Sequence, residues 1–198
     1  MDADAGARAC EWARRYVDVV ARFDLCPWAA PALAKGEVWI TACDQADLED
    51  ALARFAATPA AVVGLVVVPG FTGTLAALRR LRGELCERPI GRTVALAEFH
   101  PDAPLDDASA QRLIPYLRRS PDPMLQAVRH ETLAHLRRGG TTMAAELQAA
   151  VLAGHPVPPV RDIGDQIADA NLATLRRDGA ALAAALDALI SQRRASPP

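Results

Sequence analysis

The fold is decided by the stretch Ala60-Ala61-Val62-Val63-Gly64-Leu65-Val66-Val67-Val68, which ends at Pro69-Gly70. A short apolar run closed by a Pro-Gly turn is typical of a buried β-strand, and it is too short to cross a bilayer. The pattern of Thr72–Glu87 predicts a helix, and Thr93–His100 predicts another strand. Because two strands joined through a helix need a crossover connection, we expect a parallel or mixed sheet.

The same alternation extends toward the N-terminus. Apolar residues at three- and four-residue steps predict a helix over Ala5–Phe23, which must end before Pro27. A strand over Glu37–Ala42 and a helix over Asp47–Ala57 follow. We therefore expect an α/β (α+β) core over about residues 1–101, with a small sheet of three to four strands and flanking helices.

The second half of the chain has a different pattern. The acidic segment Asp102–Asp107 predicts a surface loop. Helices are predicted at Pro123–Arg138, Thr141–Ala153, Arg161–Arg177 and Gly179–Arg194. We expect a mostly helical extension over about residues 102–194, within a single globular domain that spans residues 1–198.

Composition excludes several classes of function. With 198 residues, of which 51% are apolar, the chain can bury one core without disulfide or metal cross-links. Its 22 basic and 24 acidic residues leave no positive excess for nucleic acid. An N-terminus bearing Asp2 and Asp4, with no apolar segment after it, favours a cytoplasmic protein that has no membrane partner. Four cysteines without a Cys-x-x-Cys motif are expected to be free thiols.

Cys26 is the first candidate site residue, because Cys26-Pro27-Trp28 stands where the first predicted helix ends. A thiolate on such a loop could act as a nucleophile, or it could ligate a haem iron or another transition metal. The alternative is a small buried residue at a helix end, since free cysteine is among the most buried residue types. The cysteines expected to serve packing alone are Cys10, Cys43 and Cys86.

His100 and two arginines complete the candidate set. His100 ends the third predicted strand, and sites in α/β sheets collect at the carboxyl ends of strands. Its imidazole would serve as acid–base partner or as a second cofactor ligand. The run Arg118-Arg119-Ser120-Pro121-Asp122-Pro123 leads into a predicted helix that carries Arg129, and its arginines could bind a carboxylate or phosphate through the fork geometry of the guanidinium group. Of these residues, Arg119 and Arg129 are selected for the candidate site, as a clamp for an anionic group. The alternative for His100 is a hydrogen-bonded structural histidine, and the alternative for the arginines is a solvated loop. Thr72 or Thr74 is expected to act as N-cap of the helix predicted over Thr72–Glu87.

Several blocks of the sequence together resemble a known family. They are Leu25-Cys26-Pro27-Trp28-Ala29, Phe99-His100-Pro101-Asp102, Arg119-Ser120-Pro121-Asp122-Pro123 with the later Arg129, and Asn171-Leu172-Ala173-Thr174-Leu175. In order and spacing they resemble the bacterial family named domain of unknown function 1415, from about residue 10 to 180. Trp28 replaces the usual phenylalanine, and Gln126 stands where the family has histidine. The resemblance implies that Cys26, His100, Arg119 and Arg129 are the polar positions that define the group, and it supplies no reaction.

Two hypotheses of function follow. The first is a small-molecule enzyme, such as a thiolate-dependent oxidoreductase, in which Cys26 is the reactive or ligating group and the arginines hold an anionic substrate. We then expect Cys26 and His100 to approach each other, with Cys26 in an electropositive, partly accessible setting. The second is a non-catalytic binding or interaction module in which the motifs are structural. There the apolar face of the last helix, formed by Leu182, Leu186 and Leu189, could pair with a partner or a second copy.

Overall fold

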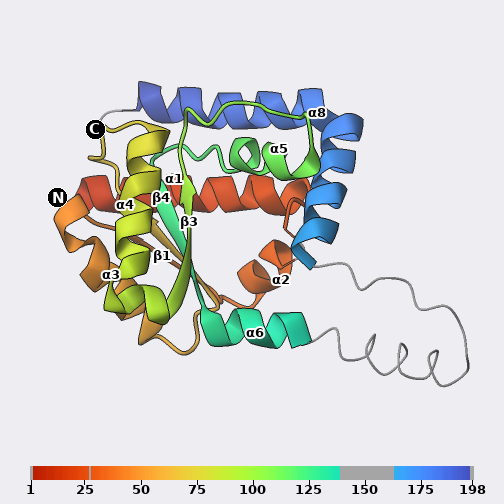
Figure 1. The fold of residues 1–198 in the computed structure, drawn as a ribbon. Coiled ribbons are helices and arrows are strands. Elements are labelled where there is room, and N and C mark those ends of the chain that lie inside the picture. Colours follow the sequence, from red (N-terminus) through yellow and green to blue (C-terminus); the bar gives the residue numbers. More distant parts are fainter. Residues whose placement is uncertain (1, 27, 139–162, 197–198) are drawn as a thin grey trace, which may run out of the picture.

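The computed structural model of the chain describes residues 2–26, 28–138 and 163–196 (Figure 1). Helices and strands alternate through most of this length. In chain order the elements are α1 (Ala3–Arg22), α2 (Ala29–Ala34), β1 (Val38–Ala42), a 3₁₀ turn (Gln45–Asp47), α3 (Leu48–Ala56), β2 (Val63–Val67), α4 (Leu75–Glu87), a 3₁₀ turn (Pro89–Arg92), β3 (Val94–Phe99), α5 (Ala110–Leu117), β4 (Met124–Arg129), α6 (His130–Arg138) and α8 (Ile163–Ala195).

The four strands form one mixed sheet in the order β1-β2-β4-β3. β1 and β2 are parallel, and β4 runs antiparallel to both β2 and β3. The carboxyl ends of β1, β2 and β3 therefore meet the start of β4 along one edge. The residues in this row are Ala42, Val67, Met124 and Phe99, each paired with the next. We call it the carboxyl edge, because loops that follow strands collect there.

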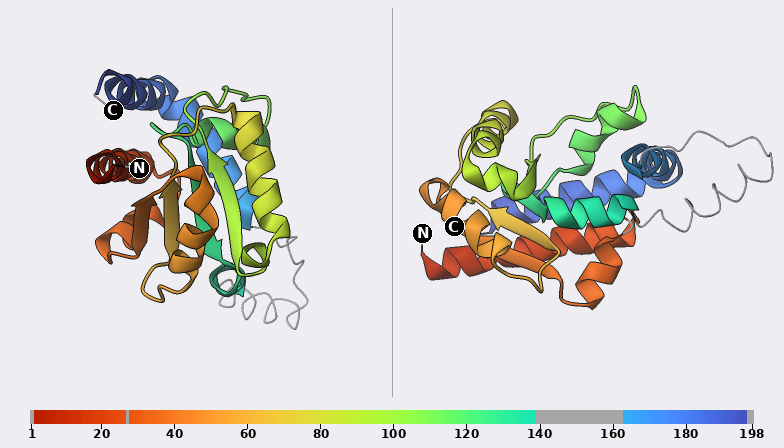
Figure 2. Two further views of the ribbon diagram at one scale, coloured as in Figure 1. Left: turned by 90° about the vertical axis from the view of Figure 1, so that its left-hand side faces the viewer. Right: turned by 60° about the horizontal axis from the view of Figure 1, so that its bottom comes forward.

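The sheet lies between two layers of helices, as the side view in Figure 2 shows for α1 and α8 on one face and α4 on the other. Alternate residues along each strand enter different cores, as the two-residue period of a strand requires. Val66 and Leu125 pack with α3 and α4, whereas Val67 and Met124 pack with α1, α5 and α8. Gly64 of β2 allows this close packing, because a Cβ there would lie 2.6 Å from the Phe55 ring of α3.

The mixed sheet, the flanking helices and the helical second half confirm the predicted fold class. The helix predicted over Pro123–Arg138 is wrong in its first part, because Met124–Arg129 is strand β4 and only His130–Arg138 is helical. β4 pairs with a strand on each side and is buried on both faces, so its apolar residues run nearly without a break. Such a short run does not distinguish a helix from a strand by periodicity alone.

Other elements of the second half also differ from expectation. The two last predicted helices form one continuous helix, α8, which bends between its lighter and darker halves in Figure 1. The helix predicted over Thr141–Ala153 lies outside the described residues. Two short helices, α2 and α5, were not predicted. The apolar face of α8 is buried against α1 and α5 within this chain, so Leu182, Leu186 and Leu189 are not available to a partner.

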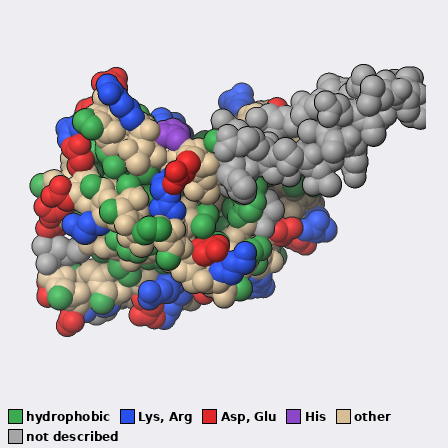
Figure 3. Space-filling model, turned by 90° about the horizontal axis from the view of Figure 1, so that it is seen from below, with side chains coloured by type: hydrophobic (Ala, Val, Ile, Leu, Met, Phe, Trp, Pro, Cys, Tyr) green, Lys and Arg blue, Asp and Glu red, His purple; other side chains and the backbone are tan. Residues whose placement is uncertain are grey.

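The surface agrees with the balanced charge of the sequence. On the face drawn in Figure 3, acidic and basic side chains are interspersed with apolar ones. Among the helices that the structure describes, none is both long and apolar enough to cross a membrane.

Candidate functional site

The C-terminus of α1 determines where Cys26 lies. Asp24 adopts a left-handed conformation with φ of 52°, which asparagine and aspartate tolerate better than most residues. Its N–H donates to the Ala21 carbonyl, and the Leu25 N–H donates to the Val20 carbonyl at 3.0 Å, which is a Schellman motif. Leu25 is buried in the core beside α1. The chain is therefore anchored immediately before Cys26.

The Cys26 sulfur lies at the start of α2 and is half-buried. Burial raises the pKa of its thiol, and the negative charge of Asp24 adds to this. Hydrogen bonds from the backbone N–H groups of Trp28 and Ala29 to the sulfur act in the opposite direction but do not outweigh burial. Burial therefore disfavours the thiolate form that the sequence led us to expect at Cys26.

Tyr16 of α1 connects Cys26 to the edge of the sheet. Its buried hydroxyl donates to the Leu117 carbonyl at 2.6 Å, and its ring meets Phe99 edge-on at 5.8 Å. Burial raises the pKa of the Tyr16 phenol, the charge of Arg118 lowers it, and Cys26 raises it. Both Cys26 and Arg118 therefore lie close enough to Tyr16 for direct electrostatic interaction.

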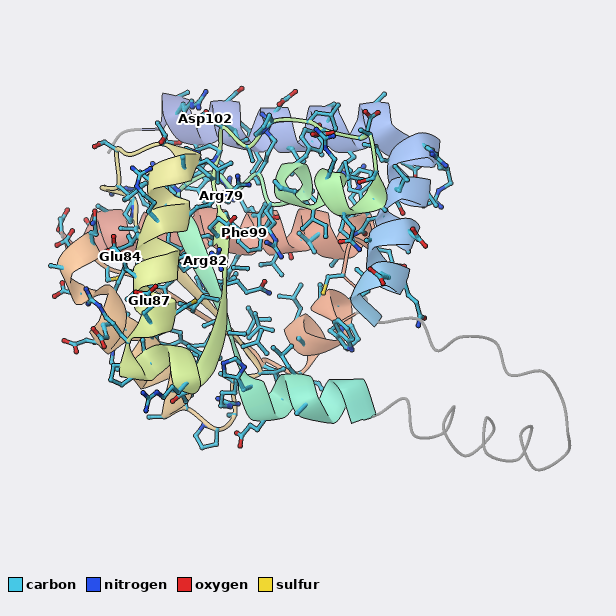
Figure 4. The ribbon with its side chains drawn as sticks, viewed as in Figure 1. Arg79, Arg82, Glu84, Glu87, Phe99 and Asp102 are labelled. Carbon is cyan, nitrogen blue, oxygen red and sulfur yellow. The ribbon has the colours of Figure 1, made fainter. Side chains whose placement is uncertain are left out.

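Arg118 lies beside Glu98, and two arginines of α4 bind the same carboxylate. The Nε atoms of Arg79 and Arg82 each lie 2.9 Å from a different carboxylate oxygen of Glu98. Arg118 lies over the ring of Phe99 at 5.6 Å. Figure 4 labels Phe99 on β3 together with Arg79 and Arg82 of α4. We call Tyr16, Cys26, Arg79, Arg82, Glu98 and Arg118 the thiol–arginine cluster. Its carboxylate belongs to β3, which pairs only with β4 in the described sheet, and its two α4 arginines contact that carboxylate.

Burial has opposite consequences for the two central charges of this cluster. Burial alone would raise the pKa of the Glu98 carboxyl. The backbone N–H of Glu98 and the nearby arginines outweigh this effect, so the pKa of the carboxyl is lowered. Burial lowers the pKa of the Arg118 guanidinium, and the charge of Glu98 counteracts this. Both groups remain charged at pH 7, since an arginine pKa starts above 12.

His100 follows β3 at the carboxyl edge, as the sequence predicted, and only 3% of it is exposed. The Asp102 N–H donates to its Nδ1 at 3.1 Å, and its Nε2 lies 3.0 Å from the Gly73 carbonyl. Because Nδ1 must accept a proton from Asp102, Nε2 carries the ring proton and donates to Gly73. The imidazole joins the loops after β2 and β3, and both of its ring nitrogens are already hydrogen-bonded to backbone.

Arg119 also lies at the carboxyl edge, where α8 binds the loops. Its Nε donates to the Pro101 carbonyl, and its Nη1 pairs with Asp187 of α8 at 2.8 Å. Two further ion pairs join α8 to the same loops at 2.8 Å, namely Arg193 with Asp122 and Arg194 with Asp102. The Arg193–Asp122 pair is buried, with side-chain exposures of 12% and 10%. This edge is held together mainly by α8.

Arg129 lies at the other end of β4, away from the carboxyl edge. Its guanidinium donates to the carbonyls of Thr58 at 3.1 Å and Pro59 at 3.3 Å, and also to that of Ala61. It lies over the Phe55 ring. These carbonyls follow α3, so Arg129 caps the loop between α3 and β2. Its hydrogen-bonding capacity is largely used inside the protein.

The structure therefore separates the four residues that the sequence selected. His100 and Arg119 meet at the carboxyl edge, and Arg129 lies at the opposite edge. In the described part of the chain no hydrogen bond joins Cys26 to His100, and Cys26 instead neighbours Tyr16. Sequence analysis considered Arg118 together with Arg119 but selected only Arg119, and it did not select Tyr16 or Glu98. Tyr16 follows the same helical spacing as core residues, so it gave no separate signal.

Within residues 2–26, 28–138 and 163–196, no group of three or more His, Cys, Asp or Glu side chains is placed to hold a metal ion. Ligation of a haem iron by Cys26 alone would not need such a group.

Comparison with known proteins adds one match. A model of the family described as protein of unknown function (DUF1415) matches residues 7–139. These residues include Cys26, the whole sheet and the thiol–arginine cluster, but not α8. No curated protein and no solved structure matches the chain.

Proposed function

The chain belongs to the DUF1415 family of proteins of unknown function, and from the geometry around Cys26 we propose that it is a small-molecule enzyme whose thiol reacts with an anionic substrate. We place it in the cytoplasm, where its cysteines would remain reduced. The nucleophile would be the Cys26 sulfur, and the attacked atom would be an electrophilic centre of the substrate.

One observation supports this proposal above the others. The backbone N–H groups of Trp28 and Ala29 act to lower the pKa of the Cys26 thiol, and Tyr16 interacts electrostatically with both Cys26 and Arg118. The N–H donors would stabilise the thiolate once the thiol loses its proton to solvent, and Arg118 would attract a negatively charged substrate. Because burial raises the thiol pKa, we expect the reaction to accelerate as pH rises above neutral.

The test compares two alkylating agents that differ in charge. Iodoacetate is an anion and iodoacetamide is neutral, so their rate ratio at one cysteine reports the local electrostatic attraction. We expect this ratio to be several-fold higher at Cys26 than at Cys86, an exposed cysteine on α4 that serves as the internal control. Peptide mass spectrometry after timed labelling gives both rates in one sample.

The variant Arg118→Gln should remove the preference for iodoacetate at Cys26 and leave the ratio at Cys86 unchanged. Cys26→Ser identifies the labelled peptide. Equal ratios at Cys26 and Cys86 in the unchanged protein, or labelling of Cys26 only after denaturation, would contradict the proposal.

A second candidate, a non-catalytic binding module, is favoured by the raised pKa of Cys26 and by the internal partners of His100, Arg119 and Arg129. If it is correct, Cys26→Ser should lower stability by about 1–3 kcal/mol through a buried hydroxyl. The enzyme hypothesis instead expects a small change in stability with loss of selective labelling. Urea unfolding of the variant therefore separates the two candidates.

A further inference from the structure

The thiol–arginine cluster carries more positive charge than its own carboxylate balances. The guanidinium groups of Arg79 and Arg82 contact the carboxylate of Glu98 through their Nε atoms, each at 2.9 Å, and that of Arg118 interacts with the same carboxylate electrostatically. One arginine is enough to neutralise a glutamate, so these four groups have an excess of two positive charges.

Arg118 differs from the other two arginines in its surroundings. Among the described residues, no hydrogen bond or ion pair of its side chain is found, although it is half-buried against the Phe99 ring. The charges of Glu98, Arg79 and Arg82 act on it electrostatically, and Glu98 is already bound by the two α4 arginines. A desolvated guanidinium without a direct counter-ion is costly unless a ligand supplies one.

We propose that Arg118, assisted by Arg79 and Arg82, binds the phosphate group of a small-molecule phosphate monoester. A phosphate monoester carries a charge of about −1.5 to −2 at pH 7, which matches the excess of two positive charges, and the arginine fork suits its oxygens. Glu98 is a positioning residue, since it holds Arg79 and Arg82 against β3. The inference deepens the proposed function, because this anion site would orient the substrate of Cys26.

The test measures binding of inorganic phosphate to the full chain by isothermal titration calorimetry, with acetate at equal ionic strength as the monoanionic comparison. We expect millimolar or tighter phosphate binding, and weaker acetate binding. Arg118→Gln should weaken phosphate binding about tenfold or more, because a charge-assisted hydrogen bond is lost. Arg118→Lys keeps the charge without the fork and should give an intermediate affinity.

Arg80→Gln is the matched control, because Arg80 is an exposed arginine on the same helix as Arg79 and Arg82. It should bind phosphate as the unchanged protein does. Circular dichroism and thermal unfolding of each variant establish that the fold is retained. Should Arg118→Gln fail to fold, Arg79→Gln is used instead, because 45% of the Arg79 side chain is exposed, and a severalfold loss is expected there.

The outcomes separate this inference from the proposed thiol chemistry. Phosphate binding that needs Arg118 and persists in Cys26→Ser supports the anion site, even if Cys26 proves unreactive. Phosphate binding that is unchanged in Arg118→Gln, or acetate binding as tight as phosphate binding, overturns the inference. The proposed function also depends on the rate at which neutral iodoacetamide labels Cys26. That rate is independent of both results that would overturn the anion site.

Discussion

The carboxyl edge and the thiol–arginine cluster both gather charged and polar side chains, but they differ in how those groups are paired. At the carboxyl edge the ring of His100 has two backbone partners, and Arg119 and Asp122 each pair with α8. In the cluster, Arg118 lacks a direct counter-ion among the described residues. A polar group whose partners all lie within the protein contributes to stability. A buried polar group without such partners is a candidate for binding a ligand.

The residues of the family motifs are not the residues of the proposed site. His100 and Arg119 stand in the blocks that define the family resemblance, yet their contacts bind loops and α8. Tyr16 gave no separate signal in the sequence and Arg118 was not selected for the candidate site, yet Tyr16 interacts electrostatically with both Cys26 and Arg118. The three predictions below test whether the carboxyl edge is structural and whether the cluster is the electrostatically unusual region.

The largest effect is expected from His100→Ala. The substitution opens a cavity and leaves the Gly73 carbonyl and the Asp102 N–H without their partner, which should cost about 2–4 kcal/mol of unfolding free energy. His130 is the matched control, because its Nε2 also lies 3.0 Å from a glycine carbonyl, that of Gly91, but the residue is exposed. His130→Ala should cost less than about 1 kcal/mol. Similar losses in urea unfolding of the two variants would contradict a structural role for His100.

High pH should destabilise the protein through its buried thiols and phenol. Burial raises the pKa values of Cys26 and Tyr16, and raises that of Cys43 to about 11. Each group binds its proton more tightly when folded, so this stabilisation is complete below pH 9 and is lost as the pH rises above it.

The contribution of Cys43 alone should be about 1–3 kcal/mol by pH 11, and Cys43→Ala should remove it. Adding Cys26→Ala should then flatten the remaining decline further. The measurement is urea unfolding between pH 8 and pH 11. A stability that does not change over this range would show that these groups are not buried as described.

The smallest effect concerns the ion pairs of α8. Asp122–Arg193 and Asp102–Arg194 have the same separation of 2.8 Å, but the second pair is exposed, at 67% and 62%. Double-mutant cycles should give a coupling of about 1–2 kcal/mol for the buried pair and below about 0.5 kcal/mol for the exposed pair. Equal couplings would mean that burial at the carboxyl edge does not strengthen its contacts.

Much of the fold followed from local patterns in the sequence. The strands over Val63–Val67 and Val94–Phe99 lie within the expected ranges, and the helix over Ala3–Arg22 begins two residues before the range predicted for it. Thr74 caps α4 by accepting from the Ala77 N–H, and it is one of the two caps proposed. β4 could not be predicted, because a central strand buried on both faces has no alternation of polar and apolar residues. Its pairing depends on β2 and β3, which lie far away in the sequence.

The site was less predictable than the fold for a related reason. The position of His100 after β3 was expected, since a strand followed by His-Pro places that residue at the carboxyl edge. Whether its ring is free depends on the Gly73 carbonyl, 27 residues earlier, which no local pattern reports. The role of Arg118 likewise depends on Phe99 and Glu98 of strand β3, which a local pattern around Arg118 does not reveal. Spacing identifies candidate residues, and tertiary contacts assign their roles.

The packing of α8 on α1 has a consequence for biosynthesis. Leu182 and Leu186 cover the same core as Ala9 and Tyr16, so the packing of α1 is completed by a helix that is made much later. At ribosomal rates of about 5–20 residues per second, synthesis of the chain between α1 and these leucines takes roughly 10–30 s. Closing so long a loop is also slow in refolding, because non-local contacts form late. Until α8 is made, part of the hydrophobic face of α1 therefore remains exposed to aggregation.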